Sequence, residues 1–253
     1  MPIFLLTALF IVGLLIASIE LGRRIRRRRR DEKSSSGLGV IDGAVFGLLG
    51  LLLGFSFSGA VARFDVRREL IVREANAIGT AYLRIDLLPE VAQPQIRADF
   101  RAYLDARLAF YRYLVLDLTR ALGQLDLSEE LQKKIWTESV VAAKQTSSPA
   151  VLTLIVGALN EMFDVTTSRS VALETHPPIP IYVALVLLAL ASSLIAGFGI
   201  GDTGERQWLH TLVYASALAL TVYMIIDLEF PRIGIIRVDR YDQVLVHERI
   251  NMN

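Results

Sequence analysis

The stretch GLGVIDGAVFGLLGLLLGFSFSGAVARF, from Gly37 to Phe64, decides the fold of this chain. It is apolar and exceeds the roughly 20 residues that a helix needs to cross a bilayer. It is also rich in glycine, which costs roughly 1 kcal/mol relative to alanine inside a helix. At about 100° per residue, five glycines fall within one arc of about 80°: Gly39, Gly43, Gly47, Gly50 and Gly54. A smooth glycine face lets another backbone approach closely, so we predict a membrane helix that packs through these residues.

A second face of this predicted helix lies beside the glycines and is the candidate lining of a pore. Its residues are Asp42, Phe46, Leu49, Leu53 and Phe57. A carboxylate inside an apolar span is costly to bury and marks a functional hypothesis. Alternatively, Asp42 is shallow enough to pair with arginines at the membrane surface. The two phenylalanines either narrow a pore or face lipid and fill gaps.

The composition indicates a membrane protein and excludes several other classes. Of the 253 residues, 53% are hydrophobic, and they are concentrated in blocks rather than spread evenly. The 27 basic and 26 acidic side chains nearly cancel, which argues against a general role in binding nucleic acid. The chain has no cysteine, so disulfides, thiolate metal sites and cysteine nucleophiles are excluded.

The first apolar block runs from Pro2 to Leu21 and is followed by an arginine cluster of Arg23, Arg24 and Arg26 to Arg30. Basic residues favour the cytoplasmic side of a membrane, so we predict a cytoplasmic cluster and an N-terminus outside. Positive charge after the apolar core is not typical of a cleaved signal peptide, and the block is therefore predicted to remain as an anchor. Beside a membrane helix, contact with anionic headgroups is favoured over nucleic-acid binding.

After Phe64 the sequence becomes highly charged and predicts a helix that leaves the membrane without a break. Ile71, Ala75 and Ile78 follow the spacing of an amphipathic helix, which we expect to end near Pro89. Its polar side chains are expected on a solvated face, with a vestibule or ligand site as the alternative: Glu74, Asn76, Thr80, Arg84 and Asp86.

Three more helices are predicted before the next apolar block. One runs from Pro94 to about Leu116, and a last one from Pro149 to about Ala172. Between them, Gly123 is expected to interrupt the helical pattern, and a new helix is expected to start near Asp126 and end near Gln145.

The remaining chain predicts a membrane hairpin and a tail. Ile179 to Ile200 and Leu209 to Leu228 are apolar enough to span, and the short turn GDTGERQ joins them. In the tail, Ile233 to Val238 and Gln243 to His247 have the pattern of short strands.

The predicted fold is an all-α membrane protein with four transmembrane helices, a helical extramembrane domain inserted between the second and third, and a short β-like C-terminal tail. The predicted segments are an anchor with its arginine cluster (1–36), the second transmembrane helix (37–64), the helical domain (65–176), the hairpin (177–228) and the tail (229–253). Counting crossings places the helical domain and the tail outside, unless the second segment is a re-entrant hairpin.

Three separated blocks of the sequence have the character of a known family. They are GLLLGFSFSGAVARFDVRRELIVREANAIGTAYLRIDLLP (Gly50 to Pro89), LNEMFD (Leu159 to Asp164) and FPRIGIIRV (Phe230 to Val238). In this order they resemble the bestrophin-like domain family of bacterial membrane proteins, over about Val40 to Val238.

The resemblance implies a distant similarity to bestrophins, which are oligomeric anion channels that line a central pore with their second membrane helix. It therefore implies a homo-oligomer in the bacterial inner (plasma) membrane, with permeating ions and with Phe46 and Phe57 as neck residues. The spacing of these two phenylalanines departs from the even i, i+4, i+8 spacing of bestrophins. The outer-side domain departs as well, because bestrophins place their main soluble portion in the cytoplasm.

No motif of an enzyme accompanies these features. A GxSxG elbow, a phosphate loop and a dinucleotide fingerprint in a strand–helix setting are all lacking, and the three histidines are far apart. Glu161 and Asp164 form only a weak signal for a cation. We therefore predict no enzyme, no cofactor and no metal, with membrane lipid, further copies of the chain and permeating ions as partners.

The leading functional hypothesis is an oligomeric ion channel with its pore around the second transmembrane helix, where anion selectivity rests on the resemblance alone. The alternative is a non-conducting, membrane-anchored protein. Such a protein would bind a partner, or sense a signal in the cell envelope, through its helical extramembrane domain.

Overall fold

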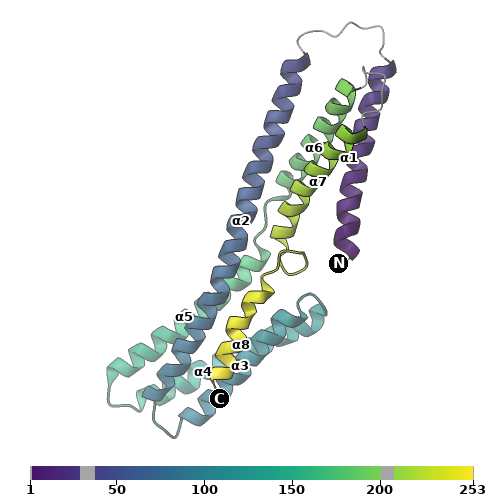
Figure 1. The fold of residues 1–253 in the computed structure, drawn as a ribbon. Coiled ribbons are helices and arrows are strands. Elements are labelled where there is room, and N and C mark those ends of the chain that lie inside the picture. The colour runs from purple at the N-terminus through teal and green to yellow at the C-terminus, as the bar shows by residue number, and fades with distance from the viewer. Residues whose placement is uncertain (1, 29–37, 201–207, 253) are drawn as a thin grey trace. The chain divides into compact units, whose positions relative to one another are not determined.

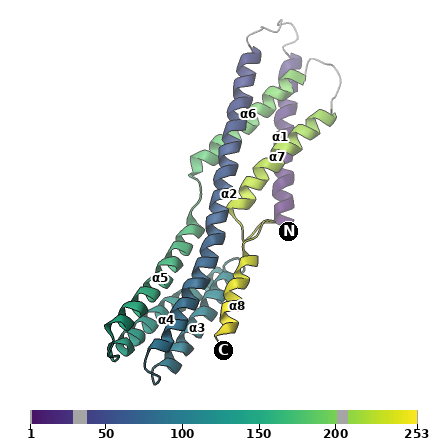
Figure 2. The same cartoon turned by 60° about the vertical axis from the view of Figure 1, so that its left-hand side comes forward.

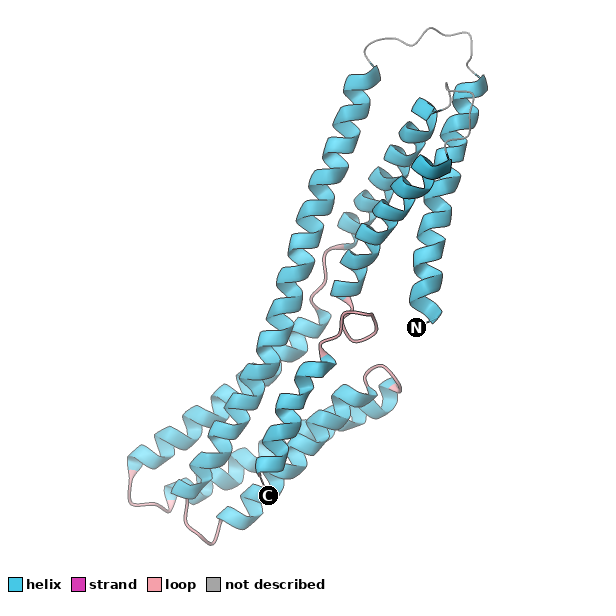
Figure 3. Ribbon diagram, viewed as in Figure 1, coloured by secondary structure: helices cyan, strands magenta, loops and turns pink. Residues whose placement is uncertain are grey.

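The protein was analysed as a computed structural model that describes residues 2–28, 38–200 and 208–252 (Figure 1). Within these ranges all regular structure is helical, as the predicted fold class requires (Figure 3). The chain divides into two compact units. The first comprises Met1–Ala62 and His176–Ile236, and the second comprises Arg63–Thr175 and Arg237–Asn253. The predicted turn GDTGERQ and the end of the arginine cluster, Arg29 and Arg30, lie outside the described residues.

The first unit contains the most apolar helices. They are α1 (Pro2–Arg28), the N-terminal part of α2 (Leu38–Arg84), α6 (Ile179–Ile200) and α7 (Trp208–Glu229). Four helices of the described chain are long and apolar enough to cross a membrane. The bounds of α6 agree with the prediction, and α7 is longer than predicted by one residue at each end.

Helices α1 and α6 pack closely against each other (Figure 2), and two glycines lie in their contact. A β-carbon at Gly22 would overlap the carbonyl oxygen of Leu194, and a β-carbon at Gly197 would overlap the carbonyl oxygen of Ile19. The Ser18 hydroxyl adds a hydrogen bond of 2.9 Å to the carbonyl of Leu190. Small residues and serine hydroxyls are how membrane helices associate when the surrounding lipid offers no hydrophobic driving force.

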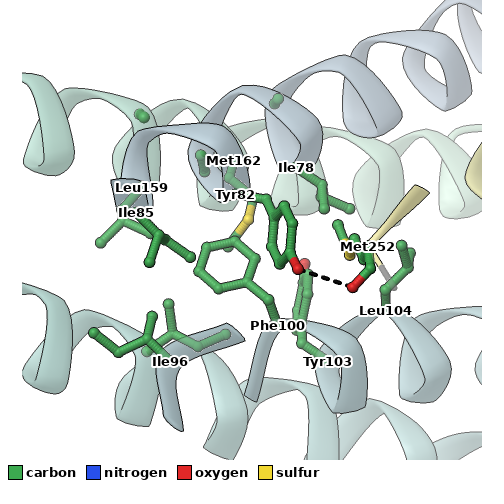
Figure 4. Packing of buried hydrophobic residues seen from close by; sticks show 14 of the residues in the cluster. Ile78, Tyr82, Ile85, Ile96, Phe100, Tyr103, Leu104, Leu159, Met162 and Met252 are labelled. Carbon is green, nitrogen blue, oxygen red and sulfur yellow. Dashed lines mark hydrogen bonds between the residues drawn. The ribbon is translucent and has the colours of Figure 1, made fainter. Parts of the chain in front are cut away.

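The second unit is built from the rest of α2 and six shorter elements. They are η1 (Ile85–Leu87), α3 (Gln93–Tyr113), α4 (Leu118–Lys144), α5 (Pro149–Glu174) and η2 (Asp239–Asp242) with α8 (Gln243–Asn251). Their core is a cluster of aliphatic and aromatic side chains in which Phe100, Tyr103 and Leu104 are fully buried (Figure 4). The long helix predicted beyond Phe64 is confirmed, because α2 is continuous over 47 residues.

The predicted start of the fourth helix was wrong. Helix α4 begins at Leu118 rather than near Asp126, and Gly123 lies inside it. The cause is Asp117, whose carboxylate accepts a hydrogen bond of 3.1 Å from the backbone N–H of Arg120. An aspartate at this position satisfies a free donor of the first helical turn. A glycine inside the helix weakens it by only about 1 kcal/mol, which does not end it.

The β-like tail was also wrong, because the described tail contains helices and no strand. Gln243 to His247 lie in α8, whose Leu245 is fully buried in the core of the second unit. The Tyr82 hydroxyl donates to the carbonyl of Met252 at 2.9 Å and fixes the end of this segment (Figure 4). In the other predicted strand, the backbone N–H groups of Ile235 and Ile236 donate to a side chain, as described below, and make no strand ladder.

Candidate functional site

The predicted pore face lies on the first part of α2, within the first unit. Phe46 meets Tyr214 of α7 edge to face, with ring centroids 6.4 Å apart and an interplanar angle of 88°. Leu49 is buried, Asp42 and Leu53 are half-buried, and Phe46 and Phe57 are each 37% exposed. In a single chain, therefore, Leu49 belongs to the packed side of α2 while the two phenylalanines keep an open edge.

The glycine face of α2 has no neighbour in the described chain. A β-carbon built at any of the five stripe glycines meets nothing within 4 Å outside its own stretch of helix: Gly39, Gly43, Gly47, Gly50 and Gly54. This differs from the two glycines between α1 and α6, which touch main chain directly. Packing through the stripe stays a prediction, and a partner for it would have to come from beyond the residues that the structure describes in this chain.

Beyond the apolar stretch, α2 carries an ionic centre that is closed to solvent. It consists of Glu74 on α2, Arg107 on α3 and Arg169 on α5, whose exposed fractions are 0%, 0% and 3%. The Nε of Arg107 donates to Oε1 of Glu74 at 2.9 Å, and Arg169 donates to Oε2. One carboxylate thus ties three helices of the second unit together.

Two more side chains complete this ionic centre. The Tyr111 hydroxyl bonds to Arg107, and the Arg169 guanidinium lies 3.6 Å from the centroid of the Tyr111 ring. Arg169 also donates to Oδ1 of Asp242 in η2 at 2.6 Å. With two arginines and two carboxylates the formal charges cancel, which is the condition under which buried charges are tolerated.

The arginines set the ionisation of the centre. Burial alone would raise the pKa of Glu74, but the positive charges of Arg107 and Arg169 outweigh burial and hold this pKa below its ordinary value. Burial likewise acts to lower the pKa of Arg107, while Tyr111 and Glu74 raise it further than burial lowers it. Glu74 and its two arginine partners are therefore charged at neutral pH, and the centre acts as a structural clamp.

The expectation that Glu74 lies on a solvated face was wrong. The signal that identifies its burial is positional: Glu74 follows Ile71 by three residues and precedes Ile78 by four, so it lies within the apolar stripe of its own helix. Arg107 has the same relation to Leu104 and Tyr111. A charge inside an apolar stripe indicates a buried ion pair.

The end of α7 and the loop after it form a second tight arrangement, in the first unit. The carboxylate of Asp227 accepts hydrogen bonds from the backbone N–H groups of Ile235 and Ile236, at 2.9 and 2.8 Å, and from the Tyr223 hydroxyl at 3.1 Å. Gly234 passes so close to this carboxylate that a β-carbon there would overlap it. This loop contains the block FPRIGIIRV, whose glycine thus has a steric role.

The acidic and histidine side chains considered for metal binding make other contacts in the structure. Among the described residues no group of three or more histidine, aspartate or glutamate side chains is arranged to hold a metal. Glu161 pairs with Arg73 at 3.3 Å. His176, to which no chemistry was assigned, stacks on Phe230 with a centroid distance of 4.7 Å.

The chain is similar to known proteins over nearly its whole length. The family model of the bestrophin-like domain matches residues 8–242. A point variant of a bacterial bestrophin homologue from Klebsiella pneumoniae superposes with a TM-score of 0.71 at 15% identity, over 98% of each chain. The homologue from the same organism solved by zinc phasing gives 0.70 at 15% identity, over 98% of this chain and 97% of that one. Such identities show the fold alone. No curated protein matches the sequence.

Proposed function

This chain belongs to the bestrophin-like domain family, and from that premise we propose that it forms an oligomeric ion channel with a pore around α2. The channel lies in the inner membrane of a bacterium, and its selectivity for anions is carried over from the resemblance to bestrophins. The proposed lining is Asp42, Phe46, Leu53 and Phe57, the members of the predicted face that are not buried within the single chain.

The observation that carries the proposal is the open glycine face of α2. Five glycines in a helix cost roughly 5 kcal/mol relative to alanine, at about 1 kcal/mol each. A helix that faced only lipid would gain nothing in return, whereas close contact with another helix offsets this cost. Because no described part of the same chain covers the stripe, a second copy of α2 is the proposed neighbour. Second helices that pack in a ring surround the axis of the assembly.

The orientation in the membrane is part of the proposal. The arginine cluster after α1 lies in the cytoplasm, and the N-terminus lies outside. With a single crossing by α2, the helical domain (65–176) is outside as well. Accessibility of single cysteines to a membrane-impermeant thiol reagent tests this directly, because the natural chain has no cysteine that would react in the background.

Ion flux tests conduction. The purified chain in liposomes is expected to release trapped chloride when a counter-ion pathway is supplied, and empty liposomes serve as the control. Liposomes that contain the oligomer but stay silent across different anions, cations and pH values would refute the channel.

Assembly is tested separately from conduction. Gly47→Leu places a bulky side chain on the stripe and is expected to lower the mass of the particle in nanodiscs or detergent. Gly13→Leu on α1 is the matched control, since Gly13 also has nothing within 4 Å of its β-carbon position. Equal masses for wild type and both variants would show that the stripe is not an interface between copies.

A further inference from the structure

A cleft of about 710 Å³ lies between α4 and α5 in the second unit. Trp136 of α4 and Phe163 of α5 form an aromatic pair in its wall, with ring centroids 6.2 Å apart and an interplanar angle of 47°. Both residues are half-buried, and both line the cleft. The volume is that of a site for a small molecule.

The hydroxyl groups of the cleft share the back-bonding that is common for serine and threonine in helices. Every serine and threonine in its lining donates its proton to a carbonyl of its own helix, at 2.7 to 3.1 Å: Ser128, Thr137, Thr166, Thr167 and Ser170. A hydroxyl has one proton to donate and two lone pairs that accept. With their protons engaged, the exposed Thr137 and Thr167 and the half-buried Ser170 offer the cleft acceptors.

The base of the cleft is held in the same way. Because Thr166 donates to the carbonyl of Met162, the hydrogen bond of 2.9 Å between Tyr103 and Thr166 runs from the tyrosine to the threonine. The Tyr103 hydroxyl accepts from the side-chain amide of Gln132 at 3.2 Å. The tyrosine proton is therefore also engaged, and the base is fixed before any ligand arrives.

The charge of the lining is balanced. Glu129 and Lys133 are its two charged residues, they have opposite signs, and both are exposed. The lining also contains the side-chain amides of Gln132 and Asn160, which both donate and accept. It therefore suits a ligand without net charge that carries several hydroxyl groups and presents an apolar face to the aromatic pair. A carbon ring bearing hydroxyl groups combines these three properties, since its C–H face packs on Trp136 or Phe163.

We propose that the cleft between α4 and α5 binds a neutral polyhydroxylated ligand, a sugar of one or two rings. The proposal is independent of conduction, because it concerns only groups on α3, α4 and α5. It gives the helical domain a ligand of defined chemical class.

The chain contains a built-in reporter for this site. It has two tryptophans, and Trp208→Phe leaves Trp136 as the single indole. The full-length variant is placed in nanodiscs, which avoids sugar-based detergents, and is titrated with maltose and with glucose. A saturable change in Trp136 emission in the millimolar range is expected with at least one of them.

Two further variants separate the proposed contact from a general effect. Thr167→Val removes a cleft acceptor at nearly constant shape and is expected to weaken binding about tenfold, within the range of a lost hydrogen bond. Ser168→Ala is the matched control, because Ser168 is exposed and bonds to the carbonyl of Asp164 at 2.8 Å, but lies outside the cleft. It should bind as the parent does.

Three results would each overturn the proposal. One is the absence of a saturable change with both sugars. Another is saturation by choline but not by sugar, which would make the aromatic pair a site for organic cations. A third is weaker acrylamide quenching of Trp136 in the assembled protein than in the single chain, which would show that a second copy covers the cleft.

Discussion

Replacement of Glu74 by glutamine should be one of the most damaging single changes in the second unit. Glutamine keeps the shape but removes the negative charge, so two buried arginines then face a neutral amide. Both guanidiniums are at most 3% exposed, and water cannot replace the lost partner. Breaking a buried ion pair by removing one member costs about 3–5 kcal/mol. That is a large part of the roughly 5–15 kcal/mol by which a folded domain is stable.

Thermal unfolding of the full chain in nanodiscs measures this effect. For a chain of this size each kcal/mol corresponds to roughly 2–4 °C, so the midpoint of Glu74→Gln should fall by roughly 6–20 °C. Glu161→Gln is the control, because Glu161 also pairs with an arginine, Arg73, at 3.3 Å, but the two side chains are 59% and 53% exposed. An exposed pair of this kind contributes at most about 1 kcal/mol.

The dependence on pH gives a second test of the same reasoning. The pKa of Glu74 is lowered in the folded protein, so its contribution to stability is complete above the pKa of an unfolded glutamate and is lost as the pH falls through the lower, folded value. The stability gap between wild type and Glu74→Gln should therefore persist at mildly acidic pH and close only under strongly acidic conditions. A variant as stable as the Glu161→Gln control at neutral pH would refute the clamp.

Two of the close approaches of a glycine to an oxygen atom, at Gly197 and Gly234, give further predictions. Gly197→Ala should lower the unfolding midpoint and the yield of membrane-inserted protein, because its methyl group has no room beside the carbonyl of Ile19, whereas Gly13→Ala should have no such effect. Gly234→Ala should push the loop away from Asp227 and speed hydrogen exchange at the loop amides. Unchanged exchange in this variant would contradict the steric role of the glycine.

Much of the fold was predictable because its signals are local. The bounds of α6 follow from the prolines before it and from its uninterrupted apolar run, both of which act within a few residues. The continuity of α2 follows from the absence of any breaker between Phe64 and Arg84. What these signals could not supply is the identity of partners that lie far away in the sequence.

The ionic centre shows the limit most clearly. Arg107 and Arg169 follow Glu74 by 33 and 95 residues, so no local pattern pairs them. The tail is a similar case: the β-branched residues near Ile235 favour a strand, but the carboxylate of Asp227 takes their N–H groups. The burial of Leu49, one of the candidate pore residues, could not be predicted either, because it depends on which helices surround α2.

The contact between α1 and α6 restricts how these two helices can change over evolution. At Gly22 and Gly197 the obstacle to a larger residue is a main-chain carbonyl, which is present whatever amino acid occupies the opposite position. No second-site substitution across the contact can therefore restore a variant at either glycine. Gly79 is different, since the atoms opposite it belong to the side chain of Glu248. A genetic screen for suppressors should rescue a Gly79 variant through Glu248, and should return only true revertants at Gly22 and Gly197.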